Sequence, residues 1–254
     1  MAHSFFVIFA FFVAILLLMA SRIAYFLILV AWVGALWFGL DYAAWKKAVP
    51  VAVPTTQVDW PEFFVANILP SLPVVEETGT PLRPPDGEGA VVTLPFLFQG
   101  QHLGEDWSTA KGDAAKGEPV YSIADGWVSV SQDFENAWGK AVFICYRLPE
   151  GRWPSFVEVM YAQLATTDVQ AGQFVKRGQQ IGTVGNANGT YLAHLHWEVR
   201  QTVGLGVGPG FDTKRDGWLG PTEFLQAHRG PRAPQPLRMK VLTDAERDGC
   251  GTDY

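Results

Sequence analysis

From about Val91 to His228, short runs rich in Val, Ile, Tyr, Phe and Trp alternate with glycine-containing breaks. Four such runs are EPVYSIADGWVSVSQ, KAVFICYRL, SFVEVMYAQL and QQIGTVG, and dipeptides such as Asp125-Gly126 and Gly185-Asn186 mark turns. No long amphipathic helix interrupts the runs, although PTEFLQAH at 221–228 predicts a small helix. The pattern therefore predicts a mostly β domain with an antiparallel sheet over residues 91–230.

Most of the uninterrupted apolar sequence precedes this domain. Residues 5–20 and 23–40 contain no charged side chain and are separated only by Ser21-Arg22. A membrane-spanning helix needs about 20 apolar residues, and a soluble helix rarely stays apolar on every face for so long. We therefore expect a membrane anchor within residues 1–45, built from one or two apolar helices.

The part played by the first apolar run stays open. Arg22 in mid-bilayer would cost about 2.5–3.5 kcal/mol, and residues 1–18 could be translated and spanning or cleaved as a signal peptide. Our preferred hypothesis is that translation begins at Met19, so that Arg22 precedes one signal anchor. N-terminal sequencing tests it, because a peptide containing residues 5–15 would exclude that start. Lys46 and Lys47 after the span leave the positive-inside rule ambiguous.

The segments on either side of the β domain have a different composition. Residues 46–90 are rich in proline, which fixes φ and removes a hydrogen-bond donor, so they predict an extended linker. Within that linker, DWPEFFVANIL at 59–69 predicts a short helix. The polar, proline-containing tail at 231–254 is predicted to be disordered.

Charge and cysteine content exclude some functions. The net charge of -6 and the absence of a Lys/Arg cluster argue against nucleic-acid binding, which needs a basic surface. Cys145 lies in the apolar run AVFICY and is expected to be a buried small side chain, and Cys250 lies in the tail. A disulfide between them stays open, but neither belongs to a CxxC pair, so a cysteine-ligated zinc site is not expected.

Two histidine clusters stand out among the five histidines, HLGED at 102–106 and HLH at 194–196. Side chains two apart on a strand share a face, so His194 and His196 can point into one cleft. His102 and Asp106 can point the same way in extended backbone. Two imidazoles and a carboxylate are a usual catalytic zinc set, which leaves one position for water. Each cluster alone is more simply an ordinary strand or turn; together they favour a metal site.

The sequences around these clusters strengthen that interpretation. HLGEDW, GEPVYSIADGWV, FVKRGQQIGTVGN and YLAHLHWEVR occur in this order. They resemble the successive motifs of the lysostaphin/LytM-type zinc metalloendopeptidases, namely HxGxD, a strand with an ADG turn, a glycine-flanked GQxIG turn and HxH. The resemblance covers roughly residues 98–228 and implies a small antiparallel β-sheet peptidase domain with a groove.

The resemblance also implies roles for individual residues. His102, Asp106 and His196 match the zinc ligands, and His194 matches the histidine that handles protons or stabilises the tetrahedral intermediate. The family usually has a further histidine in a YxHL motif, where this chain has Gln163. A glutamine can donate a hydrogen bond to an oxyanion but cannot shuttle a proton. Loss of one acid–base group can cost about 100- to 10,000-fold in rate.

Neighbouring side chains are less constrained by the motifs. Glu198 follows His196 at strand spacing and could support its imidazole or face solvent. Glu105 should alternate away from His102 and Asp106, so we expect it to be solvated. Four tryptophans could line a substrate groove, although aromatic side chains are more often core: Trp107, Trp138, Trp153 and Trp197.

The leading expectation is a membrane-anchored zinc metalloendopeptidase that hydrolyses peptide bonds in peptidoglycan stem or cross-bridge peptides. Its catalytic domain would lie on the periplasmic or external side of the cytoplasmic membrane, where the wall is. Zn²⁺ is the expected cofactor, peptidoglycan peptides and the membrane are the expected partners, and a protein activator is a further candidate. The main alternative is a catalytically weakened or inactive wall-binding module that regulates other cell-wall hydrolases. A third is a zinc peptidase that acts on a protein substrate.

Overall fold

A computed structural model describes residues 60–135, 137–149, 151, 154–230, 236–243 and 246. The chain divides into two units, Met1–Ala52 and Val53–Tyr254, and every described residue belongs to the second. The expected membrane anchor, Cys250 and Trp153 therefore lie outside the described residues. Within the described part, no helix has both the length and the apolar character to cross a membrane.

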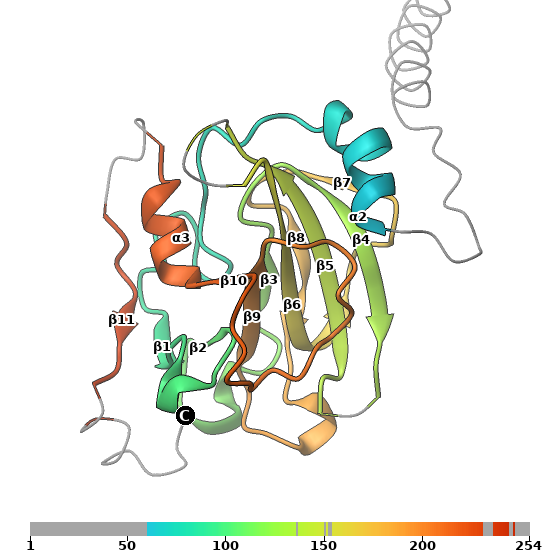
Figure 1. Ribbon diagram of the computed structural model, residues 1–254. Helices are drawn as coiled ribbons and strands as arrows, with labels where there is room; N and C mark the ends of the chain where they lie inside the picture. Colours follow the sequence, from blue (N-terminus) through green and yellow to red (C-terminus); the bar gives the residue numbers. More distant parts are fainter. Residues whose placement is uncertain are drawn as a thin grey trace, which may run out of the picture. The chain divides into compact units, whose positions relative to one another are not determined.

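The described domain is built on a single sheet of 11 strands (Figure 1). Its strands are β1 (Val91–Leu94), β2 (Glu105–Ser108), β3 (Pro119–Tyr121), β4 (Gly126–Asp133), β5 (Lys140–Arg147), β6 (Phe156–Thr167), β7 (Phe174–Val175), β8 (Gln180–Val184), β9 (Leu195–Arg200), β10 (Trp218–Leu219) and β11 (Lys240–Val241). The main path runs β11-β1-β2-β9-β6-β5-β4-β7, with β10 paired to β9 and β8 joining β3 to β6. All pairs are antiparallel except β1 with β11. The prediction of a mostly β domain is confirmed.

Strand alternation gives the sheet two different faces. On β9, Leu195, Trp197 and Val199 join the main hydrophobic core. His196 lies opposite Ala162 of β6 and therefore points to the other face. There a smaller cluster of Ala141, Phe143, Met160 and Ala162 is buried. The face opposite the main core is consequently where the polar residues of β9 gather.

Among the residues that the structure describes, only short helices accompany the sheet. The described part begins with α2 (Trp60–Phe63), a π-helical turn (Phe64–Ile68) and a 3-10 turn (Leu69–Ser71), and later forms α3 (Pro221–Ala227). Further 3-10 turns occupy Phe98–Gly100, Gly112–Ala115 and Ala187–Gly189. Both predicted helical segments, 59–69 and 221–228, are thus helical in their described parts.

Residues 60–90 pack on the sheet, which differs from the extended linker predicted over 46–90. Phe64, Ile68 and Leu82 are almost fully buried, and the Phe64 ring meets that of Phe156 edge-on at 5.2 Å. Backbone bonds also tie the segment to the domain, for example Val75 N to Arg147 O at 2.8 Å. The prolines removed regular structure, but the apolar side chains between them still gained from burial.

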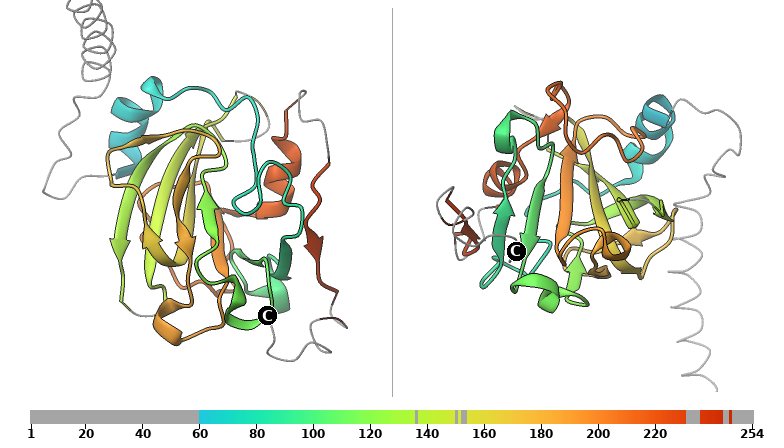
Figure 2. Two further views of the ribbon diagram at one scale, coloured as in Figure 1. Left: turned by 180° about the vertical axis from the view of Figure 1, so that it is seen from behind. Right: turned by 90° about the horizontal axis from the view of Figure 1, so that it is seen from below.

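The described part of the tail also departs from the predicted disorder of 231–254. Residues Lys240 and Val241 form β11, which pairs in parallel with β1 at the edge of the sheet. Figure 2 shows this strand beside β1 and α3 in both views. Arg238 N donates to Asp86 O at 2.8 Å, so the tail also fastens the segment before β1.

Candidate metal centre

Sheet register brings the two predicted histidine clusters together. Asp106 of β2 lies directly opposite His196 of β9 in an antiparallel pair, so their side chains share a face. His102 precedes β2 and forms an isolated bridge with Phe211, while His194 precedes β9 and bridges Gly185. Residues about ninety positions apart in the chain therefore converge at one end of the β2–β9 pair.

One carboxylate oxygen is the centre of the cluster. Asp106 Oδ1 lies 2.8 Å from His196 Nδ1, 3.5 Å from His102 Nε2 and 3.6 Å from His194 Nε2. His102 Nε2 and His196 Nδ1 are 3.3 Å apart. The candidate ligand atoms of His102, Asp106 and His196 all lie within 4.8 Å of one another, which suits a metal ion.

The outer nitrogen of each imidazole fixes what the inner nitrogen can do. His102 Nδ1 lies 3.0 Å from the carbonyl oxygen of Pro95, which can only accept, so this nitrogen carries the proton. His196 Nε2 lies 3.1 Å from Glu198 Oε1 and likewise donates. In neutral rings, His102 Nε2 and His196 Nδ1 are then both acceptors, and both face Asp106 Oδ1. Three acceptors that converge without a donor require a cation between them, and these residues therefore fit a metal ion.

Electrostatics agree with this requirement for positive charge. Burial alone would raise the pKa of Asp106, but the surrounding imidazoles of His194, His102 and His196 hold it well below its usual range. Burial alone would lower the pKa of His196, but its bonds to Asp106 and Glu198 outweigh that effect and raise the pKa to about 9. In the absence of a metal ion, the cluster thus favours a proton at the same position.

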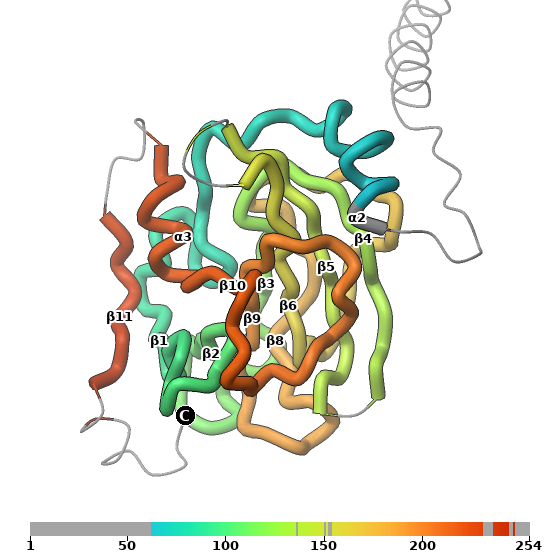
Figure 3. The backbone as a smooth tube through the Cα atoms, in the orientation of Figure 1, coloured from blue at the N-terminus to red at the C-terminus, as the bar shows by residue number. Residues whose placement is uncertain are grey.

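Glu198 extends the site along β9. Its Oε1 accepts from His196, and its Oε2 accepts from Arg200 Nε at 2.8 Å and from Trp218 Nε1 at 2.6 Å. Arg200 is fully buried and also donates to the carbonyl oxygens of Gly206 and Val207. The loop after β9, drawn in orange in Figure 3, is therefore bonded to the strand that carries His196. The sequence left open whether Glu198 supports the His196 imidazole or faces solvent, and in the structure it contacts the imidazole.

Aromatic side chains surround the histidines. The Phe211 ring stacks on His102 at 4.7 Å, Trp138 meets His196 edge-on at 5.3 Å, and Tyr191 meets His194 at 5.9 Å. Phe211 and Tyr191 are both exposed. Among the tryptophans considered from the sequence, Trp138 therefore contacts the site, whereas Trp107 and Trp197 pack edge-on in the main core at 5.6 Å.

Gln163 lies beside the site but is engaged elsewhere. Its backbone N–H donates to Trp138 O at 2.8 Å, and its side-chain Nε2 donates to Ala137 O at 3.3 Å. Its backbone is left-handed, with φ of 62°. The side-chain Oε1 is buried and has no partner among the described residues. In this arrangement the amide donor is occupied by a loop carbonyl, so a bond to substrate would require it to turn.

The prediction that Glu105 is solvated is wrong. Glu105 does alternate away from Asp106, but it points toward the main core and is only 4% exposed. Its carboxylate accepts from Trp107 Nε1 at 2.8 Å, and from the N–H and hydroxyl of Thr222 at the start of α3. Burial raises its pKa, which these hydrogen bonds partly offset. The alternation of side chains along the strand predicted that Glu105 points away from Asp106. It could not predict that α3 packs on that side and buries the carboxylate.

Arg200, Phe211 and Trp218 were not singled out from the sequence. Arg200 lies two residues after Glu198, as Glu198 lies two after His196 on the same strand. Because side chains two apart share a face of a strand, this spacing predicts Arg200 on the face of His196. Phe211 and Trp218 follow a glycine-rich loop whose path no local pattern predicts. Their contacts with His102 and Glu198 depend on how that loop returns.

The segment that carries this site is similar to a known protein family. Residues 100–208 match the family described as Peptidase family M23. The chain is similar to this family over that segment, which is less than half of its length. The match includes Asp106, the three histidines around it and also Gln163, and it confirms the resemblance inferred from the motifs.

Individual relatives match different shares of the chain. The cell division protein DipM of Caulobacter vibrioides is 36% identical over 87 residues, which are 34% of this chain but only 13% of DipM. A zinc-containing peptidase from Vibrio cholerae is 35% identical over 39% of this chain and 26% of its own, with a TM-score of 0.31. Lysostaphin from Staphylococcus simulans is 19% identical over 64% of this chain and 54% of its own, with a TM-score of 0.38.

Proposed function

We propose that this M23 domain is a zinc-dependent endopeptidase that hydrolyses amide bonds in the peptides of peptidoglycan. The single observation that carries the proposal is the convergence of three acceptor atoms, from His102, Asp106 and His196, within 4.8 Å of one another. A Zn²⁺ ion held there would supply a Lewis acid that polarises the scissile carbonyl and lowers the pKa of bound water. The family match supports the reaction class.

The other residues of the site then act on the substrate and on its protons. His194 Nδ1 lies 2.7 Å from the carbonyl oxygen of Leu192 and therefore carries a proton, so Nε2 is free to accept one. That Nε2 is 3.6 Å from Asp106 Oδ1, at the edge of the cluster, where it can take a proton during attack and return it to the leaving amine. Glu198 holds the His196 ring in the orientation that exposes Nδ1.

The substrate and the location are further parts of the proposal. Peptides of the cell wall lie outside the cytoplasmic membrane, so the domain would act on the periplasmic or external side. The apolar runs of residues 1–45 would anchor it there, and the following segment would join anchor and domain. A protein activator would be needed only if purified protein binds zinc without cleaving.

The decisive experiment is digestion of purified peptidoglycan by the zinc-loaded full chain, with mass spectrometry of the released fragments. We expect zinc-dependent cleavage of one kind of peptide bond and none from His196→Ala. His228→Ala is the matched control, since His228 is also buried but its ring nitrogen Nδ1 bonds to the carbonyl oxygen of Phe224 in α3, and it should cleave like the wild type. Cleavage retained by His196→Ala would contradict the proposed centre.

A second function is favoured by one observation. Gln163 stands where the resembling peptidases carry a histidine, and its amide nitrogen is bonded to Ala137 O. A catalytically weakened wall-binding module that regulates other hydrolases would show this departure. The intact acceptor cluster argues for catalysis instead, because a module without activity has no need of it. Absence of both stoichiometric zinc and cleavage of any wall peptide would favour the module.

A further inference from the structure

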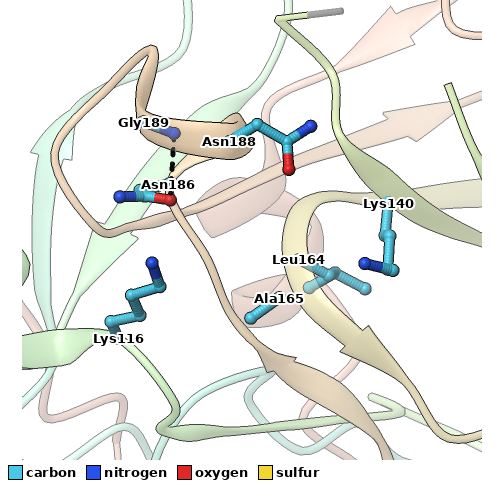
Figure 4. A pocket seen from close by; sticks show the side chains of 7 residues that line it. All are labelled: Lys116, Lys140, Leu164, Ala165, Asn186, Asn188 and Gly189. Carbon is cyan, nitrogen blue, oxygen red and sulfur yellow. Dashed lines mark hydrogen bonds between the residues drawn. The ribbon is translucent and has the colours of Figure 1, made fainter. Parts of the chain in front are cut away.

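A pocket of about 450 Å³ opens between the start of β5, the second half of β6 and the loop after β8 (Figure 4). Its polar lining consists of Lys116, Lys140, Asn186 and Asn188. Leu164 and Ala165 of β6 form an apolar part of the wall. In Figure 4 the two lysine side chains come from opposite sides of the space, so two ammonium groups flank one cavity in a chain whose net charge is -6.

The two ammonium groups are available to a ligand. Lys140 has one surface partner, Asp133, at 3.7 Å, and both side chains are about two-fifths exposed, so this pair is worth little. No described acidic residue forms an ion pair with Lys116. Asn186 Oδ1 accepts from Gly189 N at 3.2 Å, which leaves its amide nitrogen as a donor. The pocket therefore offers positive charge and an amide donor.

Three residues that line the pocket directly follow residues that lie at or beside the metal centre. Lys140 follows the Trp138-Gly139 segment, and Trp138 packs against His196. Leu164 follows Gln163, whose N–H is bonded to Trp138 O. Asn186 follows Gly185, which bridges His194. A Cβ on Gly139 would meet Ala187 Cα at 3.3 Å, so the loops before β5 and after β8 touch beside the site. One extended peptide could therefore reach both places.

We propose that this pocket is a subsite for a carboxylate of the peptide substrate. A carboxylate accepts charge-assisted hydrogen bonds from both ammonium groups and a neutral one from Asn186, while the carbon chain that bears it packs on Leu164 and Ala165. The inference deepens the proposed peptidase function and rests on it for the identity of the ligand. The enzyme then prefers peptides with a free carboxylate a short distance from the bond that is cut.

Equilibrium binding tests the subsite without requiring cleavage. The probes are N-acetyl-tri-alanine with a free C-terminal carboxylate and the same peptide as its C-terminal amide, titrated into the metal-free full chain. We expect the acid to bind about 10-fold more tightly than the amide. In Lys116→Gln/Lys140→Gln this preference should disappear, and in the control Lys214→Gln, an exposed lysine of the loop after β9, it should persist.

The outcomes separate this proposal from the proposed function. Equal binding of acid and amide, no binding of either, or an unchanged preference in the double variant would overturn the subsite. Tighter binding of inorganic phosphate than of the acid peptide would also overturn it, because the pocket would then suit another anion. Cleavage by the zinc-loaded chain is measured in parallel. Lysine-dependent acid preference without cleavage would retain the subsite and reject the peptidase.

Discussion

His102 Nε2 lies 3.3 Å from His196 Nδ1, and each ring directs its other nitrogen at an acceptor outside the cluster. Two nitrogen lone pairs that face each other beside the Asp106 carboxylate repel unless a cation lies between them. A bound metal ion would remove this repulsion in the folded state alone, since the unfolded chain does not hold the three residues together.

Zinc should therefore stabilise the folded chain, and loss of one ligand should abolish the effect. At a free zinc concentration of 100 times the Kd, mass action predicts about 2.7 kcal/mol of added stability. Calorimetry should record a higher Tm with zinc for the wild type, and elemental analysis one zinc per chain. His196→Ala should show neither, whereas His228→Ala should show both. Equal zinc content in His196→Ala and wild type would exclude His196 as a ligand.

His194 should be separable from the ligands by experiment. It lies 3.6 Å from Asp106 Oδ1 but outside the group of three whose ligand atoms converge. We expect His194→Ala to keep stoichiometric zinc and to lose about 100- to 10,000-fold in kcat, because it removes proton transfer but not the metal. Zinc content and kcat are measured on the same preparation. Loss of zinc together with activity would make His194 a ligand instead.

The sequence predicted those parts of the site that follow from local periodicity. His194 and His196 reach the same carboxylate because they are two apart. That Asp106 lies opposite His196 depends on the pairing of β2 with β9, which local spacing did not show. The four motifs in order also indicated the family, and with it the sheet-rich fold. These features need only short spacing or the characteristic order of the family's motifs.

The remaining features depend on residues far apart in the chain. Glu105 is buried because α3 begins 117 positions later and presents Thr222 to it. The proline-rich segment packs because Phe64 finds Phe156, which no reading of its composition could reveal. The tail pairs with β1 for the same kind of reason. Long-range pairing decides burial, whereas composition reports only local preference.

Replacement of Gln163 by histidine should raise activity. The left-handed φ of 62° at this position is one that histidine adopts more readily than most residues. A histidine there could move protons, which glutamine cannot, and such a group is worth about 100-fold or more. We expect Gln163→His to increase kcat on wall peptides by about 10-fold or more, measured against Gln163→Asn as a neutral amide control. An unchanged kcat would mean that His194 already does this work.

Glu198 should tune metal affinity through His196. Glu198→Gln keeps the shape but removes the charge that orients the imidazole, so zinc affinity should fall about 10- to 100-fold. The same change leaves the buried Arg200 without its ion-pair partner, which can cost about 3–5 kcal/mol of stability. Glu198→Gln/Arg200→Met removes both charges. It should recover stability while zinc affinity, measured by competition with a chelator, stays weak; restored affinity would assign the effect to folding alone.

Glu105 should matter for stability and little for zinc. Glu105→Ala leaves the buried donor of Trp107 and the half-buried donors of Thr222 without an acceptor, and a buried donor so left costs about 1–3 kcal/mol. We expect a fall of about 2–4 kcal/mol in the free energy of unfolding, measured by urea denaturation. Glu105→Gln retains one acceptor oxygen, so its loss should be smaller. Both variants should keep stoichiometric zinc, because the carboxylate points to the core side of β2 while Asp106 points to the other; zinc loss in Glu105→Gln at unchanged stability would contradict that separation of faces.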